Sequence, residues 1–573
     1  MDFNLVIAGE AGQGLNTLNF VLSKILFKSG FHVYSTKDYE SRVRGGHNFM
    51  KIRFGDTKIT APKDEQDILL ALNKAAVEIH QDFVKEDGIM IYNGESYEGE
   101  LREENQDKEI FSLEAALIAD DIGNGRVANT VFVGVLLKLL GLDLKVAEEV
   151  LGEYFRRAED IKGMNIDALR KGYEKAEVAK RRFEMPEVTP RDNQILINGN
   201  QAIGMGAAVA GVQFYSAYPM TPATGVMNYL AKRQNDLGIV VEQAEDEIAA
   251  IMMALGGSYS GIRSMTGSSG GGFSLMVEAL GFAGIAEIPL TIVNVQRPGP
   301  ATGLPTRTEQ ADLLFAINAS QGDFPLMVIG VKDAEDAFYQ TYRAVNLAEK
   351  YQMPVIILSD QFLADTEINL EAFELDTLQR YNGFISDEQA EGISDYKRYE
   401  FTEDGISPLA YPGQMTESVV LIDSDEHDEH GHIIEDAETR VAMVDKRHDK
   451  IEKLILEDLE EPEYIGPEET DYLLIGWGST YGPLQEAREL LEEDGYNVGL
   501  LTFSDVWPLP IEELEDRIDN TVSIMVENNA TAQFSRLISS ETGIMVNHEI
   551  VKYDGRPYTA EEIYDAIKEE VID

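Results

Sequence analysis

The chain has 573 residues, long enough for three or four domains of ordinary size, and its 44% hydrophobic content supports buried cores. With 102 acidic and 48 basic side chains, its formal net charge of −54 disfavours binding to nucleic acid or to an anionic membrane. The absence of cysteine excludes disulfides, thiolate nucleophiles and cysteine-ligated iron–sulfur clusters within this chain.

The longest apolar run, VFVGVLLKLLGL from Val131, is interrupted by Lys138. It is shorter than the roughly 18 residues of a membrane span, and no charged-then-apolar leader precedes it. We therefore expect a soluble, cytoplasmic protein. The acidic excess fits a protein from a salt-rich cell, where salt screens the repulsion between its charges. The alternative is an acidic enzyme surface that has no role in the mechanism.

The first segment opens with an apolar strand, NLVIAG, followed by GEAGQG, the helix NTLNFVLSKILFKSG and the strand FHVYST. This is the beginning of a βαβ unit, and strands and helices alternate to about Arg182. Gly12 and Gly14 lie in the turn, where glycines allow close backbone approach and a helix N-terminus favours an anion. Their spacing is not GxGxxG, so a tight turn without a ligand is the alternative.

Two arginines follow in the motif SRVRGG, at Arg42 and Arg44. They face either an anionic group or a neighbouring subunit, and the sequence does not choose between these interpretations.

After the charged, proline-containing linker KRRFEMPEVTPRDNQ, a second segment starts near Ile195. Its apolar runs alternate with helical stretches and predict a parallel sheet covered on both faces. Ligands of such sheets bind at the carboxyl ends of the strands. From about Thr366 to Glu469 the apolar periodicity thins into an acidic connector. The strands YLLIGWG, NVGLLTF and VSIMVEN then indicate a final compact α/β unit.

The motif YPMTPAT follows a strand of the second segment. Pro219 and Pro222 restrict the backbone around Thr221, whose hydroxyl we expect to face a ligand. The alternative is a rigid connection in which Thr221 or Thr224 caps a helix.

The motif VEQAEDEI places Glu242, Glu245 and Glu247 at the start of an apolar helix. Acidic residues are common there because they complement the helix dipole. At a strand's carboxyl end, however, such a carboxylate points into the crevice, where it is able to bond a ligand's ring nitrogen.

The loop NVQRPGPATGLPTRTEQ places Arg297 directly after a strand and Thr306 nine residues later, in a turn stiffened by prolines. An arginine fork with threonine hydroxyls suits a small carboxylate. A local salt bridge of Arg297 is the alternative, and the role of Arg307 stays open. The glycine-serine turn TGSSGGG also allows close backbone approach. We interpret the histidines of DSDEHDEHGH as part of a solvated loop rather than a metal site, because their spacing is not helical.

These loops, in this order, resemble the 2-oxoacid:ferredoxin oxidoreductases, specifically an alpha subunit with a γ-type domain fused ahead of it. GEAGQG and SRVRGG look like the γ domain, YPMTP looks like the family's YPITP motif, and QRPGPATGLPTRTEQ looks like its substrate loop. Met220, Pro298 and SSGGG depart from the family pattern, which leaves the substrate range open. The resemblance implies an α/β fold with these parts: a γ-type domain (1–183), a doubly wound domain that binds the pyrimidine of thiamine diphosphate (190–365), an acidic connector (366–469) and a transketolase C-terminal-like domain (470–573).

The resemblance also implies roles for individual residues. Glu247 is the catalytic carboxylate that bonds the aminopyrimidine and promotes its imino tautomer, with Glu245 as the alternative. Arg297, Thr306 and Thr221 match substrate-binding positions. The remaining assignments are the cofactor contacts Tyr218, Pro219, Ser269 and Gly270, and the contacts with coenzyme A or a subunit interface Gly12, Gly14, Arg42 and Arg44.

The reaction implied is oxidative decarboxylation of a 2-oxoacid with coenzyme A, with electrons leaving to ferredoxin. No GDG motif for the metal of thiamine diphosphate occurs in the chain. We therefore expect a β subunit to supply the diphosphate site, Mg²⁺ and a [4Fe-4S] cluster, in an (αβ)₂ heterotetramer. The segment HDEHGHIIEDAETRVAMVDKRHDKIEKL resembles the 2-oxoglutarate-type subunits, which favours succinyl-CoA as product. Pyruvate or branched-chain 2-oxoacids, a non-catalytic scaffold subunit and a nicotinamide-dependent dehydrogenase are the rival interpretations.

Overall fold

The computed structural model describes residues 1–41, 45–156 and 158–572, which form two compact units. The first unit comprises Met1–Ile197 and Thr366–Ala372, and the second comprises Asn198–Asp365 and Phe373–Asp573. Among the described residues, no helix is both long and apolar enough to cross a membrane.

The first unit is built on an eight-stranded sheet in the order β6-β5-β4-β1-β3-β2-β14-β7. Its strands are β1 (Asp2–Ala11), β2 (His32–Asp38), β3 (Gly45–Gly55), β4 (Gln66–Ala71), β5 (Val84–Tyr92), β6 (Glu109–Ser112), β7 (Gln194–Asn198) and β14 (Glu367–Glu371). The predicted strand-helix-strand start is present, but β3 lies between β1 and β2 and is antiparallel to both. The acidic connector begins with β14, which pairs with β2.

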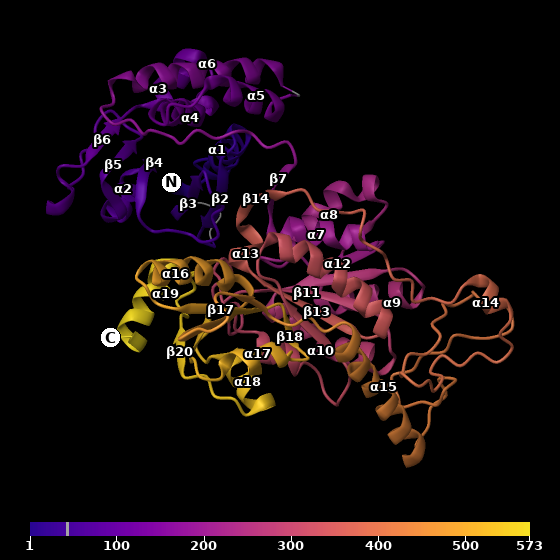
Figure 1. Ribbon diagram of the computed structural model, residues 1–573. Helices are drawn as coiled ribbons and strands as arrows, with labels where there is room; N and C mark the ends of the chain where they lie inside the picture. The colour runs from indigo at the N-terminus through magenta and orange to yellow at the C-terminus, as the bar shows by residue number, and fades with distance from the viewer. Residues whose placement is uncertain (42–44, 157, 573) are drawn as a thin grey trace. The chain divides into compact units, whose positions relative to one another are not determined.

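Helices cover both faces of this sheet because successive side chains of a strand point to opposite sides. Leu5 and Ile7 of β1 join the larger core, whereas Val6 and Ala8 pack with Ala76 on the other face. In Figure 1, α3 to α6 lie together on one side of the sheet. The helices are α1 (Leu15–Ser29), α2 (Lys74–His80), α3 (Ala115–Ile122), α4 (Ala128–Leu139), α5 (Leu144–Tyr154) and α6 (Glu159–Lys175).

The predicted linker forms neither helix nor strand between Ala179 and Asp192. It packs on the first unit nonetheless, since the ring centroids of Phe183 and Phe3 are 6.0 Å apart.

The second unit contains a seven-stranded sheet in the order β18-β12-β13-β11-β10-β8-β9. Its strands are parallel except β18, which pairs antiparallel with β12 and comes from the C-terminal part of the chain. The strands are β8 (Phe214–Ala217), β9 (Val240–Gln243), β10 (Ser264–Ser268), β11 (Leu290–Gln296), β12 (Met327–Gly330), β13 (Pro354–Asp360) and β18 (Asp505–Trp507).

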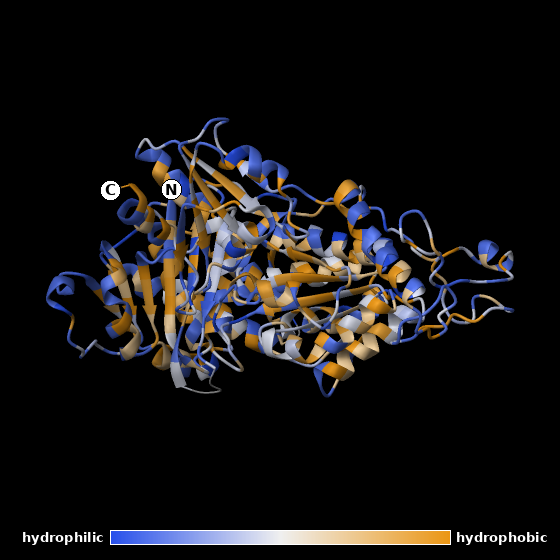
Figure 2. Ribbon diagram, turned by 90° about the horizontal axis from the view of Figure 1, so that it is seen from below, coloured by the Kyte–Doolittle hydropathy of each residue, from blue (hydrophilic) through white to orange (hydrophobic). Residues whose placement is uncertain are grey.

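Helices flank this sheet in the doubly wound arrangement that the apolar runs predict. Leu290 and Ile292 of β11 share a core with α9 and α10, while α12 packs on α7, β11 and β13. Figure 2 shows the strands as mainly hydrophobic segments. The helices are α7 (Gly199–Ala210), α8 (Thr224–Leu237), α9 (Glu247–Tyr259), α10 (Gly270–Ile285), α11 (Leu313–Ile317), α12 (Ala334–Tyr351) and α13 (Gln361–Asp365).

The same unit ends in a five-stranded sheet, ordered β15-β17-β16-β19-β20, in which only β15 is antiparallel to its neighbour. Its strands are β15 (Glu463–Ile465), β16 (Tyr472–Trp477), β17 (Val498–Phe503), β19 (Val522–Glu527) and β20 (His548–Val551). The accompanying helices are α16 (Tyr481–Glu493), α17 (Glu512–Ile518), α18 (Gln533–Thr542) and α19 (Ala560–Ile567).

The segment that the sequence suggests is a thin connector also contains α14 (Asp387–Glu391) and the long helix α15 (Ala437–Glu457). Lys446 and Lys450 of α15 are buried and bond the carboxylate of Glu287, which follows α10; the Lys446 Nζ to Glu287 Oε1 distance is 2.8 Å. Breaking such a desolvated ion pair is costly, so α15 is firmly attached to the second unit.

Candidate active site

The loops that the sequence analysis singles out in the second unit follow β8, β9, β10 and β11 at their carboxyl ends. These strands are parallel neighbours, so their carboxyl ends lie at one edge of the sheet. The four loops therefore share a single edge, and any ligand bound there is within reach of more than one of them.

Glu247 is the first residue of α9, and its side chain is buried at 4% exposure. Asp246 caps the helix by accepting a hydrogen bond from the Ala249 N–H at 2.8 Å, so the Glu247 side chain does not serve as the N-cap. The Oε1 atom of Glu247 is buried and has no hydrogen-bond partner in the described part of the chain. An unpaired, buried carboxylate oxygen costs stability, which marks this atom as an acceptor for a ligand's donor. Glu245, the alternative carboxylate, is exposed.

The start of α10 packs closely on Glu247. A Cβ atom at Gly272 would lie 2.6 Å from Oε1 of Glu247, and one at Gly270 would lie 2.7 Å from Oδ2 of Asp312. Only glycine fits at these two positions. Ser269, between β10 and α10, is fully buried and makes no capping bond, and its Oγ has no partner among the described residues.

The YPMTP turn follows β8. Tyr218 is 38% exposed, Thr221 is exposed, and the Thr221–Pro222 peptide bond is cis. The carbonyl of Thr221 accepts a hydrogen bond from Nη1 of Arg297 at 2.7 Å. The Pro222 carbonyl accepts one from Asn200 at 3.0 Å. The structure thus joins Thr221 to Arg297 through the backbone and leaves the threonine side chain exposed; Ala223, rather than a threonine, is the N-cap of α8.

Arg297 is half-buried directly after β11. Its Nε atom is buried and has no partner among the described residues. Burial lowers the pKa of Arg297, and the nearby Asp312 carboxylate opposes that shift. A guanidinium with one edge tied to the protein and Nε unpaired is able to hold an anionic ligand.

The loop after Arg297 is held in a tight turn. Gly303 has φ of 52°, and a Cβ there would lie 1.8 Å from the Pro298 carbonyl oxygen. Leu304 N–H donates to the same carbonyl at 3.1 Å. Thr306 is buried at 9% exposure, and no hydrogen bond between it and Arg297 occurs in the described structure. The loop thus orders both residues without bonding one to the other.

The far end of this loop is fixed by residues that the sequence analysis did not single out. Thr308 Oγ1 donates to Asp360 Oδ1 at 3.1 Å. Gln310 Nε2 donates to the Trp477 carbonyl at 2.7 Å, and Gln310 N–H donates to the Asn528 carbonyl at the same distance. The Thr308 bond ties the loop to the end of β13 in the seven-stranded sheet, and the Gln310 bonds tie it to the ends of β16 and β19 in the five-stranded sheet. Their only sequence signal was the polar run TRTEQ at the end of the loop.

Two further carboxyl groups missed by the sequence analysis, Glu309 and Asp312, lie in the same loop. Burial, and repulsion from Asp312, raise the pKa of Glu309 to about 7. Burial also raises the pKa of Asp312, although the Asn294 amide, 3.0 Å away, and Arg297 counteract this. Asp312 therefore lies between Arg297 and the start of α10 and connects the two parts of the site.

Three family models match successive parts of the chain. They are "Pyruvate ferredoxin/flavodoxin oxidoreductase" over residues 4–175, "Pyruvate flavodoxin/ferredoxin oxidoreductase, thiamine diP-bdg" over residues 205–446, and "Pyruvate:ferredoxin oxidoreductase core domain II" over residues 470–563. The 2-oxoacid:ferredoxin oxidoreductase subunit alpha of Sulfolobus sp is 34% identical, over 99% of this chain and 96% of the relative. This chain belongs to the 2-oxoacid:ferredoxin oxidoreductase family.

Two other relatives agree with this assignment. The 2-oxoglutarate oxidoreductase subunit KorA of Mycobacterium tuberculosis is 30% identical, over 93% of this chain and 87% of the relative. The solved structure of 2-oxoglutarate:ferredoxin oxidoreductase from Magnetococcus marinus has 2-oxoglutarate, coenzyme A and succinyl-CoA bound; it matches with a TM-score of 0.91 and 34% identity, over 99% of both chains. The predicted family, the α/β fold and the enzyme class are confirmed.

The residues at the strand ends fit the cofactor that the thiamine diphosphate-binding model of this oxidoreductase family implies. The unpaired Oε1 of Glu247 is an acceptor and the unpaired Ser269 hydroxyl is a donor or acceptor. Gly270 and Gly272 allow the start of α10 to pack directly against the Asp312 and Glu247 carboxylates. This combination suits the amino and ring nitrogens of an aminopyrimidine.

The γ-type turn of this alpha subunit lies in the first unit. Gly12 and Gly14 follow β1 with φ of 98° and 82°, the left-handed region that glycine favours. Gly14 packs on Asn129, whose Nδ2 donates to the Gln13 carbonyl at 2.7 Å, whereas a Cβ at Gly12 would meet open space. Arg42 and Arg44 lie outside the described residues.

Proposed function

We propose that this chain is the alpha subunit of a 2-oxoglutarate:ferredoxin oxidoreductase. The reaction converts 2-oxoglutarate and coenzyme A to succinyl-CoA and carbon dioxide, and two electrons leave to two oxidised ferredoxins as one proton is released. The ligands named for the Magnetococcus marinus relative and the name of the KorA relative support this choice of substrate. Pyruvate or a branched-chain 2-oxoacid is the alternative.

The observation that carries the proposal is the buried, unpaired Oε1 of Glu247. Thiamine diphosphate, when bound, supplies the electron sink for decarboxylation. Glu247 binds a pyrimidine nitrogen and holds a proton there, because its carboxylate has one oxygen available and bulk water is excluded. Tyr218, Pro219, Ser269 and Gly270 line the cofactor.

Arg297 is the substrate clamp in this proposal. Its charge and unpaired Nε bind a carboxylate of the 2-oxoacid, while its bond to the Thr221 carbonyl fixes the guanidinium plane. Thr306, ordered by the same loop, adds a hydroxyl. Thr221 contributes through its carbonyl and its exposed side chain.

A partner subunit completes the site. The chain has no cysteine and no GDG motif, so we assign the [4Fe-4S] cluster, Mg²⁺ and the diphosphate contacts to a β subunit in an (αβ)₂ heterotetramer. Large apolar side chains next to Glu247 and on α10 support a covering protein: Ile248, Met252, Met253 and Leu275 are 43% to 52% exposed. Ferredoxin then accepts the electrons from the β subunit.

We place the domain boundaries at 1–183, 190–365, 366–469 and 470–573; the thiamine diphosphate-binding family model, over residues 205–446, extends from the second of these parts through most of the third. The turn with Gly12 and Gly14, together with Arg42 and Arg44, is our candidate for contact with coenzyme A or with a neighbouring subunit. The open space at Gly12 is compatible with either.

The test is to copurify the chain with its β subunit and measure coenzyme A-dependent reduction of a dye with 2-oxoglutarate, pyruvate and a branched-chain 2-oxoacid. We expect the highest kcat/KM with 2-oxoglutarate. A preference for another acid would reject the substrate but keep the enzyme class. Absence of turnover with all three acids, in a complex shown to contain cofactor and cluster, would favour the scaffold interpretation.

A further inference from the structure

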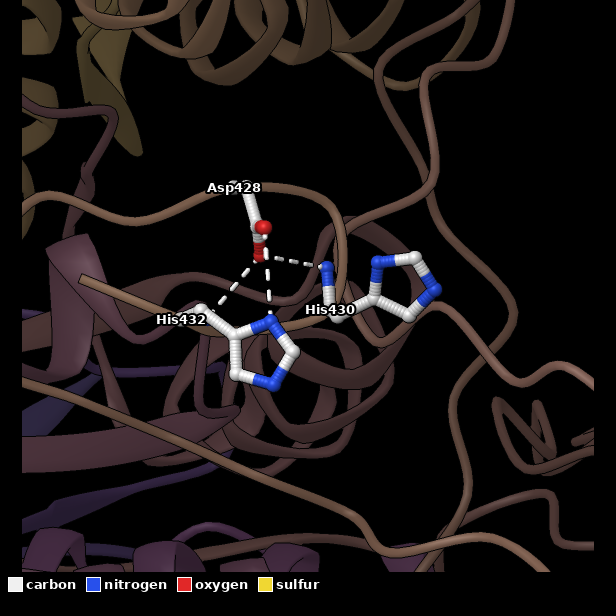
Figure 3. Close-up of side chains that lie close together, drawn as sticks. All are labelled: Asp428, His430 and His432. Atoms are coloured by element: carbon white, nitrogen blue, oxygen red, sulfur yellow. Dashed lines mark hydrogen bonds and ion pairs between the residues drawn. The ribbon is translucent and has the colours of Figure 1, made fainter. Parts of the chain in front are cut away.

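We propose that Asp428, His430 and His432 form a binding site for a divalent transition metal of the Zn²⁺ type. The three residues lie in the turn between His427 and Ile433, which form an isolated antiparallel β-bridge in the segment before α15. One ligand atom from each lies within 4.8 Å of the others. Figure 3 shows the His432 ring beside the Asp428 carboxylate, whereas the backbone nitrogen of His430 faces the carboxylate and its ring lies farther out.

Hydrogen bonds hold the backbone of the three residues, and the Asp428 carboxylate, in place before any metal binds. The N–H groups of His430 and His432 both donate to Asp428 Oδ1 at 2.9 Å. Asp428 N–H donates to the His432 carbonyl at 2.9 Å, and Gly431 makes the turn at φ of 90°. These bonds use Oδ1 of Asp428 and leave Oδ2 towards the His432 ring.

The distances suit a tetrahedral ion. His432 Nδ1 and Asp428 Oδ2 are 3.4 Å apart. Ligand atoms about 2.1 Å from a tetrahedral Zn²⁺ are about 3.4 Å from one another. The third ligand atom, on His430, lies within 4.8 Å of these two, so the His430 ring has to move closer when a metal binds.

The His430 ring is oriented by a hydrogen bond with a residue outside the loop. His430 Nε2 lies 3.0 Å from Asp395 Oδ1, and because a carboxylate only accepts, Nε2 carries the proton. Nδ1 of the neutral ring then retains its lone pair. A carboxylate that binds the second nitrogen of a histidine is the usual outer partner of a metal-binding imidazole.

The loop is anchored to the rest of the segment on several sides. The buried ring of His427 lies on Tyr399, with centroids 3.9 Å apart. Glu426 pairs with Arg447 of α15 at 2.8 Å, and the Glu429 carbonyl accepts from the Tyr399 N–H at 2.9 Å. The backbone of the site is therefore well supported, although the His432 side chain is exposed. Metal binding would cost little conformational entropy of this loop.

Two imidazoles and one carboxylate favour Zn²⁺, Co²⁺ or Ni²⁺ over Mg²⁺ and Ca²⁺, which prefer oxygen ligands. Three protein ligands leave one position for water. The strongly acidic chain also concentrates cations near its surface.

The test uses the full chain without a polyhistidine tag, stripped of metal with a chelator that is then removed. We expect one equivalent of Zn²⁺ per chain by calorimetry and one equivalent of Co²⁺ by its visible absorption. No thiolate contributes to that spectrum, because the chain has no cysteine. Excess Mg²⁺ should not displace the Zn²⁺.

We expect His432→Ala and Asp428→Asn each to weaken Zn²⁺ binding at least tenfold, and Asp395→Asn to weaken it about 10- to 100-fold. The control is His448→Ala, which removes an imidazole of α15 outside the cluster and should leave affinity unchanged. Circular dichroism of the metal-free variants checks that each is folded. No stoichiometric binding by the parent chain, or binding that survives His430→Ala combined with His432→Ala, would overturn the proposal. The assay requires no turnover, so its outcome is separate from that of the proposed reaction.

Discussion

Replacing Glu247 by glutamine, in the chain assembled with its β subunit, removes the carboxylate charge while keeping the volume of the side chain. The site has no room for rearrangement, because Gly272 packs directly on Oε1. Water is also unable to take over, since the side chain is only 4% exposed. The variant therefore loses the ability to hold a proton on the cofactor and little else.

General acid–base groups contribute about 10²- to 10⁴-fold to enzymatic rates. We expect kcat of Glu247→Gln to fall by that factor, which corresponds to roughly 3 to 5 kcal/mol in the activation barrier. KM for the 2-oxoacid should change little, because Arg297 and its loop are untouched. The measurement is steady-state dye reduction at saturating coenzyme A, with thermal unfolding of both proteins recorded as a check on folding.

Glu245→Gln is the matched control. It makes the same chemical change two residues earlier, on an exposed carboxylate, and should keep kcat within about twofold, as surface substitutions usually do. A Glu247→Gln enzyme within tenfold of the parent rate, or a Glu245→Gln enzyme that is the more impaired, would refute the reasoning from burial.

Three other predictions concern the Arg297 loop. Arg297→Ala should raise KM for the 2-oxoacid roughly 10- to 100-fold, the equivalent of a lost hydrogen bond to a charged group, and an unchanged KM would remove Arg297 from the carboxylate site. Gly303→Ala should lower the free energy of unfolding in denaturant by at least about 1 kcal/mol, because Gly303 has a left-handed backbone and its Cβ would contact Pro298. Gly299→Ala is the control, since a Cβ there meets open space. Equal stability of the two variants would contradict this reasoning. The pKa of Glu309 is raised to about 7 in the folded chain, so its ionisation opposes folding increasingly from about pH 4.5 to pH 7. The Tm of Glu309→Gln relative to the parent should therefore rise across that pH window, and a difference independent of pH would show that Glu309 ionises normally.

Local pattern in the sequence determined much of the architecture. The strands NLVIAG and FHVYST, the helix between them and the apolar runs around β8 to β13 are found where periodicity predicts them. Periodicity reports which residues of one element face a core, so it identifies elements and buried faces reliably. The motifs around Thr221, Glu247 and Arg297 could be located for a related reason, since parallel strands bring their carboxyl ends to one edge.

Partner choice between distant segments was decided only by the tertiary structure. Nothing in the local pattern of β3, β14 or β18 states that β3 separates β1 from β2, that β14 joins the first sheet, or that β18 extends the second. The charged helix α15 was similarly hidden, because Lys446 and Lys450 read as surface residues until Glu287 is placed beside them. Pairing of strands and ions depends on contacts between residues far apart in sequence, to which local periodicity is blind.

The candidate sites divide in the same way. Residue type and position at a strand end made Arg297 and the glutamates of VEQAEDEI candidates, and the resemblance to the family favoured Glu247, with Glu245 as the alternative. Burial was needed to separate Glu247 from Glu245, and folding of the loop was needed to show Gln310 as its anchor. From the sequence alone, the histidines of DSDEHDEHGH were interpreted as part of a solvated loop. The turn at Gly431 directs the backbone N–H groups of His430 and His432 to Asp428, because hydrogen bonds across the turn, rather than spacing along the chain, bring these residues together.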